Sequence, residues 1–194
     1  MADPAHPVPP SPLRTVFLDR DGVLNQKLPE GQYVASGSGF KMLPGVPLAI
    51  ARLNAAGLRV VVVSNQRGIA LGLYTPSDVH EIHSAFQRTL QAHGAHIDAF
   101  YFCPHDKLQC DCRKPLPGLF HAARADFPDI AAESSAMIGD SLSDIEFGRR
   151  LGMFTVYIEG DPTTRKPGAD AARDLAGLRC SSLPEAVAAL LNLA

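Results

Sequence analysis

The sequence lacks the features that mark membrane-spanning, nucleic-acid-binding or low-complexity chains. No stretch of its 194 residues approaches the run of roughly 18 apolar residues that a membrane helix needs. The 18 Lys and Arg against 20 Asp and Glu leave a net charge of −2, so no global charge favours nucleic acid or an anionic membrane as partner. The 16 Gly and 16 Pro are too few and too scattered for a collagen-like chain. An anionic ligand would therefore need a local cluster of cations.

The remaining composition is that of a globular protein, and the first residues are not expected to form a targeting signal. The chain is 46% hydrophobic and 20% charged, long enough to bury a real core. Residues 1–12 are rich in proline and have neither the basic start nor the apolar stretch of a signal peptide. We expect a disordered tail over 1–12, one domain over 13–194, and a cytoplasmic protein. A monomer is the default, because no long apolar stripe is left over.

Apolar runs and helical patterns alternate along the chain. Such alternation predicts an α/β fold, with a parallel sheet covered by helices on both faces. The expected strands are Thr15–Leu18, Arg59–Val63, Ala99–Phe102, Ala136–Ile138 and Phe154–Ile158. The expected helices are Pro47–Ala56, Thr75–His93, Gly118–Ala125, Ser143–Leu151 and a last one from Pro184 onward. A loop and a short helix are expected over Glu159–Leu178, and the imidazoles of His80 and His83 are expected to face solvent.

Polar residues follow three of these strands. The first is followed by Asp19 and Asp21, the second by Ser64 and Asn65, and the fourth by Gly139 and Asp140. In open α/β sheets the binding crevice lies outside the carboxyl ends of the strands, so these side chains are expected to line one pocket. The alternative is that each begins a loop or caps a helix. Recurrence at several strand ends favours a site.

The segment Asp19-Arg20-Asp21-Gly22 places two carboxylates on the same side of an extended chain. Such a pair is costly unless a cation lies between the two groups or one of them is protonated. Both solutions are chemically useful. One carboxylate can bind a hard divalent ion and attack an electrophile, while its neighbour carries the proton that a leaving group needs.

A second cluster lies in one loop, residues 103–112. It offers three thiols and one imidazole: Cys103, His105, Cys110 and Cys112. This set can close a tetrahedral site, which is a common structural zinc arrangement. Buried, unliganded thiols are a poor alternative in a loop so rich in Pro, Asp and Lys. The loop leads directly into Arg113 and Lys114, so a bound zinc ion would fix where Lys114 points.

Four motifs in this order resemble those of the haloacid dehalogenase (HAD) superfamily of phosphohydrolases, over Thr15–Ile158. They are Asp19-x-Asp21-Gly22, Ser64-Asn65, Lys114, and Gly139-Asp140 with Asp144. The resemblance implies a Rossmann-like HAD fold. No large insertion separates the motifs at the places where such folds acquire a cap domain, so no large cap is expected.

The resemblance also implies a role for each motif residue. Asp19 would be the nucleophile, and Asp21 would protonate the leaving group and later deprotonate water. Mg²⁺ would be held by Asp19, the backbone carbonyl of Asp21, and Asp140. Ser64 and Lys114 would bind phosphoryl oxygens. Asp144 would orient Lys114 or outer waters of the metal, and its alternative role is that of an acid in the first turn of a helix.

The sequences around the zinc loop and after Ser64 narrow the resemblance. CPH, CDCRKP and SNQRGIALGLYT are similar to the branch that contains D-glycero-D-manno-heptose 1,7-bisphosphate phosphatases and histidinol-phosphate phosphatases, and residues 68–75 resemble the heptose enzymes more. Asn65, Gln66 and Arg67 would then belong to a substrate-binding loop. Arg113 would recognise the distal part of the substrate, or else be a surface cation near the zinc.

Three functions remain open on this basis. The leading one is a Mg²⁺-dependent sugar-phosphate phosphatase of the heptose type, and the second is a histidinol-phosphate phosphatase. The third is a catalytically inactive, zinc-stapled binding module, against which the intact motif residues argue. The heptose enzymes of this resemblance have a small residue in place of Arg67 and a Lys in place of Ser141. We therefore hypothesise that Arg67 binds a second anionic group of the substrate.

Overall fold

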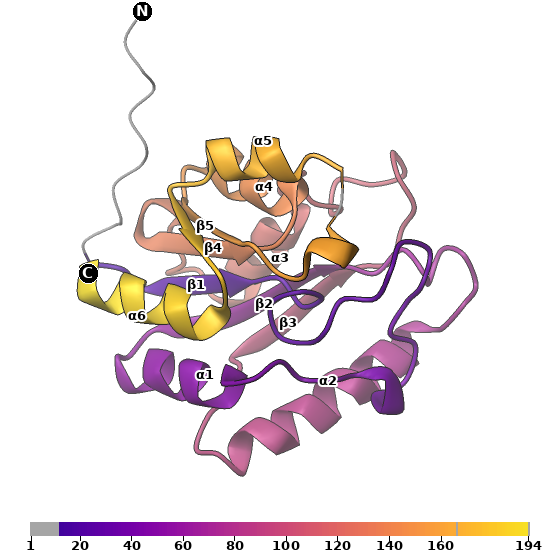
Figure 1. The fold of residues 1–194 in the computed structure, drawn as a ribbon, viewed down its shortest axis with the longest axis horizontal. Coiled ribbons are helices and arrows are strands. Elements are labelled where there is room, and N and C mark those ends of the chain that lie inside the picture. Colours follow the sequence, from indigo (N-terminus) through magenta and orange to yellow (C-terminus); the bar gives the residue numbers. More distant parts are fainter. Residues whose placement is uncertain (1–11, 166, 194) are drawn as a thin grey trace, which may run out of the picture.

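Six parallel strands form one sheet in the computed structural model, which describes residues 12–165 and 167–193. The strands are β1 (Thr15–Leu18), β2 (Arg59–Asn65), β3 (Ala99–Cys103), β4 (Ser135–Gly139), β5 (Phe154–Ile158) and β6 (Leu178–Cys180). Their order is β3-β2-β1-β4-β5-β6, and every neighbouring pair is parallel (Figure 1). Strand order reverses around β1, which places the end of β1 at the switch point of the sheet. The expected tail lies, apart from Pro12, outside the described residues.

Helices cover both faces of the sheet, as expected. They are α1 (Val46–Ala55), α2 (Pro76–Gln91), α3 (Gly118–Asp126), α4 (Leu142–Leu151), α5 (Ala169–Leu175) and α6 (Leu183–Leu193). Short 3-10 turns occur at Gly37–Gly39, Ala132–Ser134 and Pro162–Thr164. Figure 1 shows α1, α2 and α6 on one side of the sheet and α3, α4 and α5 on the other. In the described part of the chain no separate cap domain interrupts this order, so the predicted α/β architecture is confirmed.

The two layers of helices bury three apolar clusters against the sheet, one beneath α1, α2 and α6 and two on the opposite face, of which the smaller joins α4, β5 and α5. Val16 and Leu18 of β1 point into the core that includes α1, α2 and α6, whereas Phe17 between them points into the core with α3 and α4. Both faces of a central parallel strand are thus apolar, which explains the near-continuous hydrophobic runs. Polar groups are left to the strand ends.

Two helix starts are fixed by reciprocal capping boxes. On α2 the Thr75 hydroxyl accepts from the Asp78 amide while the Asp78 carboxylate accepts from the Thr75 amide. On α4 the same exchange joins Ser141 and Asp144. Helix α4 therefore begins at a defined residue directly after the polar end of β4.

The expectation for His83 is wrong. Its side chain is buried on α2, with the ring stacked on Phe100 of β3 at 4.5 Å between centroids. The apolar stripe of α2 includes His83 because its ring and that of Phe86 contact Phe100 of β3, whereas His80 one turn earlier is exposed, as expected. Strand β6 was also not expected, since it has three residues and an exposed Arg179 at its middle.

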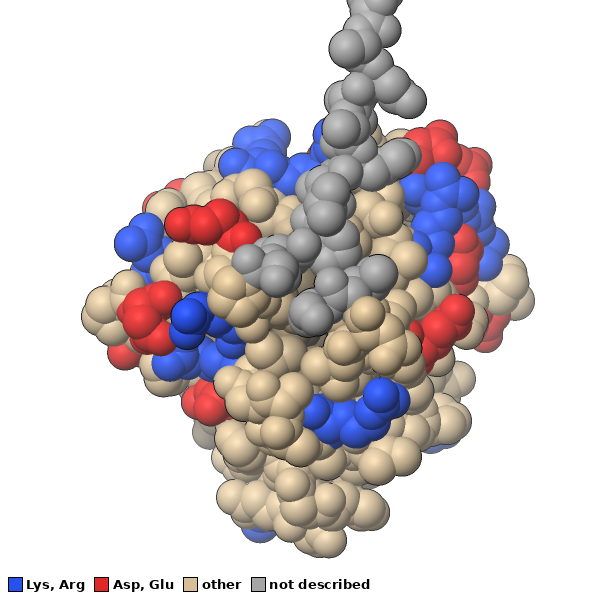
Figure 2. Space-filling view, turned by 90° about the vertical axis from the view of Figure 1, so that its left-hand side faces the viewer, with Lys and Arg blue, Asp and Glu red and all other residues tan. Residues whose placement is uncertain are grey.

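The described helices are all too short or too polar to cross a membrane. Charged side chains of both signs are interspersed on the face shown in Figure 2. That distribution is in keeping with the net charge of −2.

Candidate active site

The ends of β1 and β4 bring the first and last motifs together. The amide of Asp19 donates to the carbonyl of Ile138 at 2.9 Å, so the chain leaves both strands side by side. Gly22 then turns against Asp140: a Cβ at Gly22 would lie 2.2 Å from Asp140 Oδ2, and its φ of +100° favours glycine. The Asp-x-Asp-Gly turn therefore closes directly over Asp140.

Three buried carboxylates meet at this point. One oxygen each from Asp19, Asp140 and Asp144 can be chosen so that all three lie within 4.8 Å of one another. Lys114 Nζ lies 2.8 Å from Asp19 Oδ1 and 2.6 Å from Asp144 Oδ1, and the Lys27 ammonium pairs with Asp140 Oδ2. Two cations face three carboxylates, and Asp140 Oδ1 is buried with no hydrogen-bond partner among the described residues. The donor set fits a hard divalent cation such as Mg²⁺.

Burial disfavours the charged form of these carboxylates. It raises the pKa of Asp140 to about 7, an effect that Lys27 opposes and that Asp19 and Asp144 increase. Burial and the neighbouring Asp144 raise the pKa of Asp19 above its usual value, although Lys114 acts against them. A bound divalent cation would relieve this repulsion.

Asp21 has a different environment from Asp19. Arg20 Nη2 donates to both of its oxygens at 3.0 and 2.9 Å, Asn25 Nδ2 donates at 2.9 Å, and Gln66 Nε2 donates at 3.1 Å. Burial alone would raise the pKa of Asp21, but the charge of Arg20 and these hydrogen bonds hold it below its ordinary value. Asp21 is therefore held as an oriented carboxylate.

Lys114 is fixed at both its backbone and its ammonium group. The Asn65 side chain donates to the Lys114 carbonyl and accepts from the Lys114 amide, both at 3.0 Å. The ammonium also donates to the carbonyl of Val63 at 2.6 Å. Burial would lower the pKa of Lys114, but Asp144 and Asp19 raise it, so the group remains a cation. Asn65 contacts Lys114 here, and Asp144 both caps α4 and pairs with Lys114.

The side chains at the second motif are linked to one another. Gln66 Nε2 donates to Ser64 Oγ at 2.7 Å, and its carbonyl oxygen accepts from the Tyr74 hydroxyl at 2.7 Å. Ser64 and Gln66 are each 1% exposed. The structure thus brings Ser64, Asp19 and Lys114 to one edge of the sheet.

The four predicted zinc ligands converge. Their donor atoms lie within 4.8 Å of one another, with Sγ separations of 3.5 Å for Cys103 and Cys110 and 3.3 Å for Cys110 and Cys112, and His105 Nδ1 lies 3.3 Å from Cys112 Sγ. A zinc ion with Zn–S bonds of about 2.3 Å needs sulfur separations of roughly 3.8 Å. The cluster fits a tetrahedral ion with small adjustments.

Arg67 of the expected substrate-binding loop and Arg113, the candidate for the distal part of the substrate, both contact the zinc loop. Arg67 pairs with Asp106 through Nε–Oδ1 at 2.5 Å and Nη2–Oδ2 at 3.1 Å. Arg113 Nη1 lies 3.4 Å from the carbonyl of His105. Their guanidinium groups therefore border the site on the β3 side.

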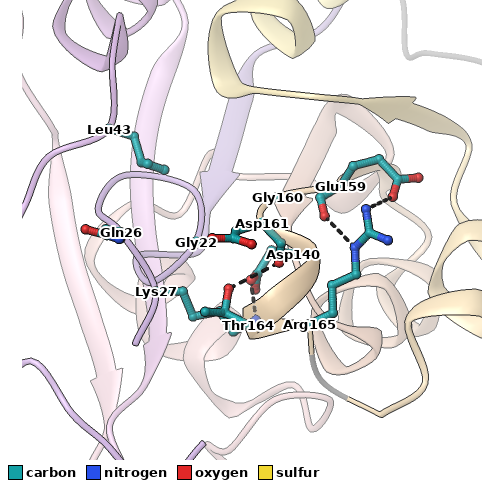
Figure 3. A pocket seen from close by; sticks show the side chains of 10 residues that line it. All are labelled: Gly22, Gln26, Lys27, Leu43, Asp140, Glu159, Gly160, Asp161, Thr164 and Arg165. Carbon is teal, nitrogen blue, oxygen red and sulfur yellow. Dashed lines mark hydrogen bonds and ion pairs between the residues drawn. The ribbon is translucent and has the colours of Figure 1, made fainter. Parts of the chain in front are cut away.

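The opposite border holds a small pocket beside Asp140. Figure 3 shows Lys27 and Asp140 facing the 3-10 turn that contains Thr164, with Arg165 bound to Glu159. Lys27 has no motif signal in the sequence, since it lies in a loop 113 positions from its partner. Arg20 and Asn25 were also not predicted as site residues. Both lie within four positions of Asp21 and carry hydrogen-bond donors, which is the signal that could have identified them.

A Rossmann-like sheet with this arrangement of Asp, Ser and Lys at its switch point defines a HAD-type phosphohydrolase. A family model described as HAD-hydrolase-like matches residues 111–186. The D-glycero-alpha-D-manno-heptose-1,7-bisphosphate 7-phosphatase of Mycobacterium tuberculosis is 42% identical over 137 residues, which cover 70% of this chain and 72% of that protein. The D-glycero-beta-D-manno-heptose-1,7-bisphosphate 7-phosphatase of Escherichia coli is 34% identical over 182 residues, covering 89% and 93%.

A solved structure of a heptose bisphosphate phosphatase has the same fold as this chain. The crystal structure of D,D-heptose 1,7-bisphosphate phosphatase from B. bronchiseptica, complexed with magnesium and phosphate, superposes with a TM-score of 0.80 at 31% identity, covering 94% of this chain and 100% of that one. The chain therefore belongs to the HAD-like hydrolases, in the family of the D-glycero-D-manno-heptose-1,7-bisphosphate 7-phosphatases. It is a HAD-type phosphatase.

Proposed function

We propose that this phosphatase removes the 7-phosphate of D-glycero-D-manno-heptose 1,7-bisphosphate through an aspartyl-phosphate intermediate. The observation that carries the proposal is the buried group of Asp19, Asp140 and Lys114, with the separately oriented Asp21 beside it. The choice of sugar is supported by the relatives, whose names state this substrate. Both the alpha and the beta form occur among those names, so the anomer is left to experiment.

Asp19 attacks the phosphorus, and the bond from phosphorus to the sugar oxygen breaks as the bond to Asp19 forms. Asp21 gives a proton to the leaving alkoxide. Because the surroundings of Asp21 favour its charged form, that proton must be taken up with the substrate, and a phosphate monoester with a second pKa of about 6 can bring it. Asp21 then takes a proton from the water that attacks the phosphoryl group, which releases Asp19 and inorganic phosphate.

The other site residues bind and orient the phosphoryl group. Lys114 and the Ser64 hydroxyl bind its oxygens, where charge is concentrated during transfer. Asp19, Asp140 and the backbone carbonyl of Asp21 would hold Mg²⁺, which when bound neutralises phosphate charge. Asp144 orients Lys114 through the 2.6 Å contact.

The zinc loop supports this arrangement from the β3 side. Cys103, His105, Cys110 and Cys112 would hold Zn²⁺ in a closed structural site, which requires thiols kept reduced, as in the cytoplasm. The loop carries Arg113 and holds Arg67 through Asp106, so these two cations are our candidates for the distal phosphate.

Phosphate release from a substrate panel tests the proposal. The panel contains both anomers of heptose 1,7-bisphosphate, histidinol phosphate and simple hexose phosphates, each with Mg²⁺ or with EDTA. We expect a preference for one heptose anomer, loss of activity in EDTA, and a fall of about 10³-fold or more in Asp19→Asn, which lacks the nucleophile. A preference for histidinol phosphate would refute the proposed substrate and leave the mechanism standing. No activity on any compound would favour an inactive zinc-stapled binding module.

A further inference from the structure

A buried line of hydrogen bonds leads from Tyr74 into the active site. The side chains of Tyr74 and Gln66 belong to residues that are only 6% and 1% exposed. Tyr74 Oη donates to Gln66 Oε1 at 2.7 Å, and Gln66 Nε2 donates to Ser64 Oγ at 2.7 Å and to Asp21 Oδ2 at 3.1 Å. All the polar atoms of the Gln66 side chain are thus engaged by three neighbours.

The neighbours of Gln66 determine which group donates and which accepts in each of these hydrogen bonds. The Asp21 carboxylate can only accept, so the NH₂ group of Gln66 must face it and the carbonyl oxygen must face away. Tyr74 therefore donates its proton to that oxygen. Since Ser64 Oγ accepts from Gln66, the one proton of Ser64 is left for another acceptor.

We propose that Tyr74 is a positioning residue which, through Gln66, directs the Ser64 proton toward the phosphoryl group. The inference rests on the proposed function, because the acceptor that it gives to Ser64 is the phosphate. It also gives Gln66 a specific role, in which this residue acts on the substrate through Ser64 rather than by direct contact. Asp21 depends less on Gln66, because Arg20 and Asn25 also donate to it.

The loop around Tyr74 holds the hydroxyl in one place. A Cβ at Gly68 would lie 2.1 Å from Tyr74 Cε1, so only glycine leaves room for the ring. The Leu73 amide donates to the Gly68 carbonyl at 2.9 Å, which closes the loop, and Thr75 next to Tyr74 caps α2. The ring position is thus set by the backbone on both sides.

Tyr74→Phe tests the inference, since it keeps the ring and removes the hydroxyl. Gln66 Oε1 then loses its buried donor, so the amide is held only from the Asp21 side and its bond to Ser64 Oγ weakens, which frees the Ser64 hydroxyl to turn away from the phosphate. We expect kcat to fall about ten-fold and the inhibition constant of inorganic phosphate to rise by a similar factor, with thermal stability used to confirm folding.

A double-variant comparison separates this role from a merely structural one. Ser64→Ala removes the proton that Tyr74 is proposed to direct, so adding Tyr74→Phe to Ser64→Ala should have little further effect on kcat. Gln66→Met, which removes the amide at similar volume, should behave in the same way if Tyr74→Phe folds poorly. Tyr101→Phe is the matched control, because it removes a hydroxyl that bonds at 2.7 Å to Asp126 at the end of α3. That variant should keep wild-type kinetics.

The outcomes are distinct. Unchanged kcat and phosphate inhibition in Tyr74→Phe, or effects of Tyr74→Phe and Ser64→Ala that simply multiply, would overturn the inference. A wild-type protein that releases no phosphate from any compound in the panel would instead refute the proposed function on which it rests.

Discussion

Asp19 and Asp21 are two residues apart, yet their surroundings shift their pKa values in opposite directions. Burial and Asp144 raise the pKa of Asp19, whereas the charge of Arg20 and several hydrogen bonds outweigh burial and lower the pKa of Asp21. The alternation of side chains along an extended segment predicts that both carboxylates face the same site. It does not predict Arg20 or Gln66 as partners, because those contacts depend on how the turn and β2 are placed in three dimensions.

The same limit applies to Lys27 and Tyr74. Asp19, Asp21, Ser64 and Asp140 could be found because each lies at the end of a strand and the carboxyl ends of parallel strands share one edge, whereas Lys114 was found through the resemblance to a family. Lys27 pairs with Asp140 across 113 positions, and the Tyr74 hydroxyl reaches Gln66 across a loop closed over Gly68. Neither contact has a spacing that local sequence patterns can show.

The burial of His83 predicts that the free energy of unfolding depends on pH. Burial, with smaller contributions from Arg20 and His80, lowers its pKa to about 3, and both ring nitrogens lack a partner among the described residues. Its unfolded pKa is about 6.5, so below that pH the unfolded chain binds a proton that the folded protein does not. This stability is fully present above pH 6.5 and is lost as pH falls toward 3, at about 1.4 kcal/mol per pH unit.

The measurement is urea unfolding of wild type and His83→Phe at pH 7 and pH 5. His83→Phe keeps an aromatic ring beside Phe100 and cannot titrate, so its free energy of unfolding should gain about 2 kcal/mol relative to wild type between the two pH values. Any constant packing difference cancels in this comparison. His121→Gln, which removes an exposed imidazole on α3, should follow wild type. Parallel pH dependence of wild type and His83→Phe would refute the prediction.

Among the helices and strands, the start of a helix is easier to predict than the outermost strand of the sheet. Thr75 before Pro76 indicates a capped helix start, and α2 begins there. Strand β4 extends one residue beyond the expected range at each end, because Ser135 pairs with Thr15 of β1 and Gly139 pairs with Tyr157 of β5. Strand β6 has only three residues and relies on pairing with β5, so its own sequence carries no clear alternation.

The zinc loop makes a prediction at this scale. The loop, residues 103–112, follows β3 and leads through Arg113 and Lys114 to α3. A Cβ at Gly118 would lie 2.7 Å from Cys112 Cα, so the loop also packs on the start of α3. Cys110→Ser should lose most of its zinc and lower kcat/KM by about 10–100-fold, because Lys114 is no longer held in place. Of the four proposed ligands only Cys112 packs against an apolar core, so the helix content measured by circular dichroism should remain.

The predicted loss of zinc and of activity in Cys110→Ser is checked by two measurements, which are zinc content by plasma mass spectrometry and phosphate release. Cys180→Ala is the matched control: Cys180 is buried in the core beneath α6, outside the loop, and its loss should leave one zinc per chain. Full activity in a Cys110→Ser protein that holds no zinc would contradict the proposed support of Lys114 by the loop.

In the whole molecule, the residues that stabilise the fold and the residues of the active site lie in different parts of the sheet. The apolar residues of the strands face the cores beneath the helices, while the acidic side chains of the site gather at the carboxyl end of β1, a central strand of the sheet in Figure 1. The presence of helices on both faces follows from the alternating pattern. The strand order β3-β2-β1-β4-β5-β6 does not, because parallel strands of similar apolar composition can be arranged in several orders before packing selects one.

This separation concentrates buried charge at one edge. Four carboxylates, those of Asp19, Asp21, Asp140 and Asp144, face three cations, those of Arg20, Lys27 and Lys114. This end of the sheet therefore has an excess negative charge, which a bound divalent cation would balance. The carboxylates meet only in the folded protein, so the cation would bind the folded state and not the unfolded chain.

Mg²⁺ should therefore stabilise the whole fold. At a concentration 100 times its Kd, a ligand that binds only the folded state adds about 2.7 kcal/mol, and for a domain of this size each kcal/mol raises Tm by about 2–4 °C. We expect a rise in Tm of roughly 5–10 °C at saturating Mg²⁺, measured by calorimetry after treatment with EDTA, at constant ionic strength. Asp140→Asn removes one donor oxygen and should lose most of that rise, although its Tm without Mg²⁺ also changes because Lys27 loses its partner. An equal rise in both proteins would show that Mg²⁺ acts elsewhere on the surface, because the stabilisation would then not depend on the carboxylate that closes the site.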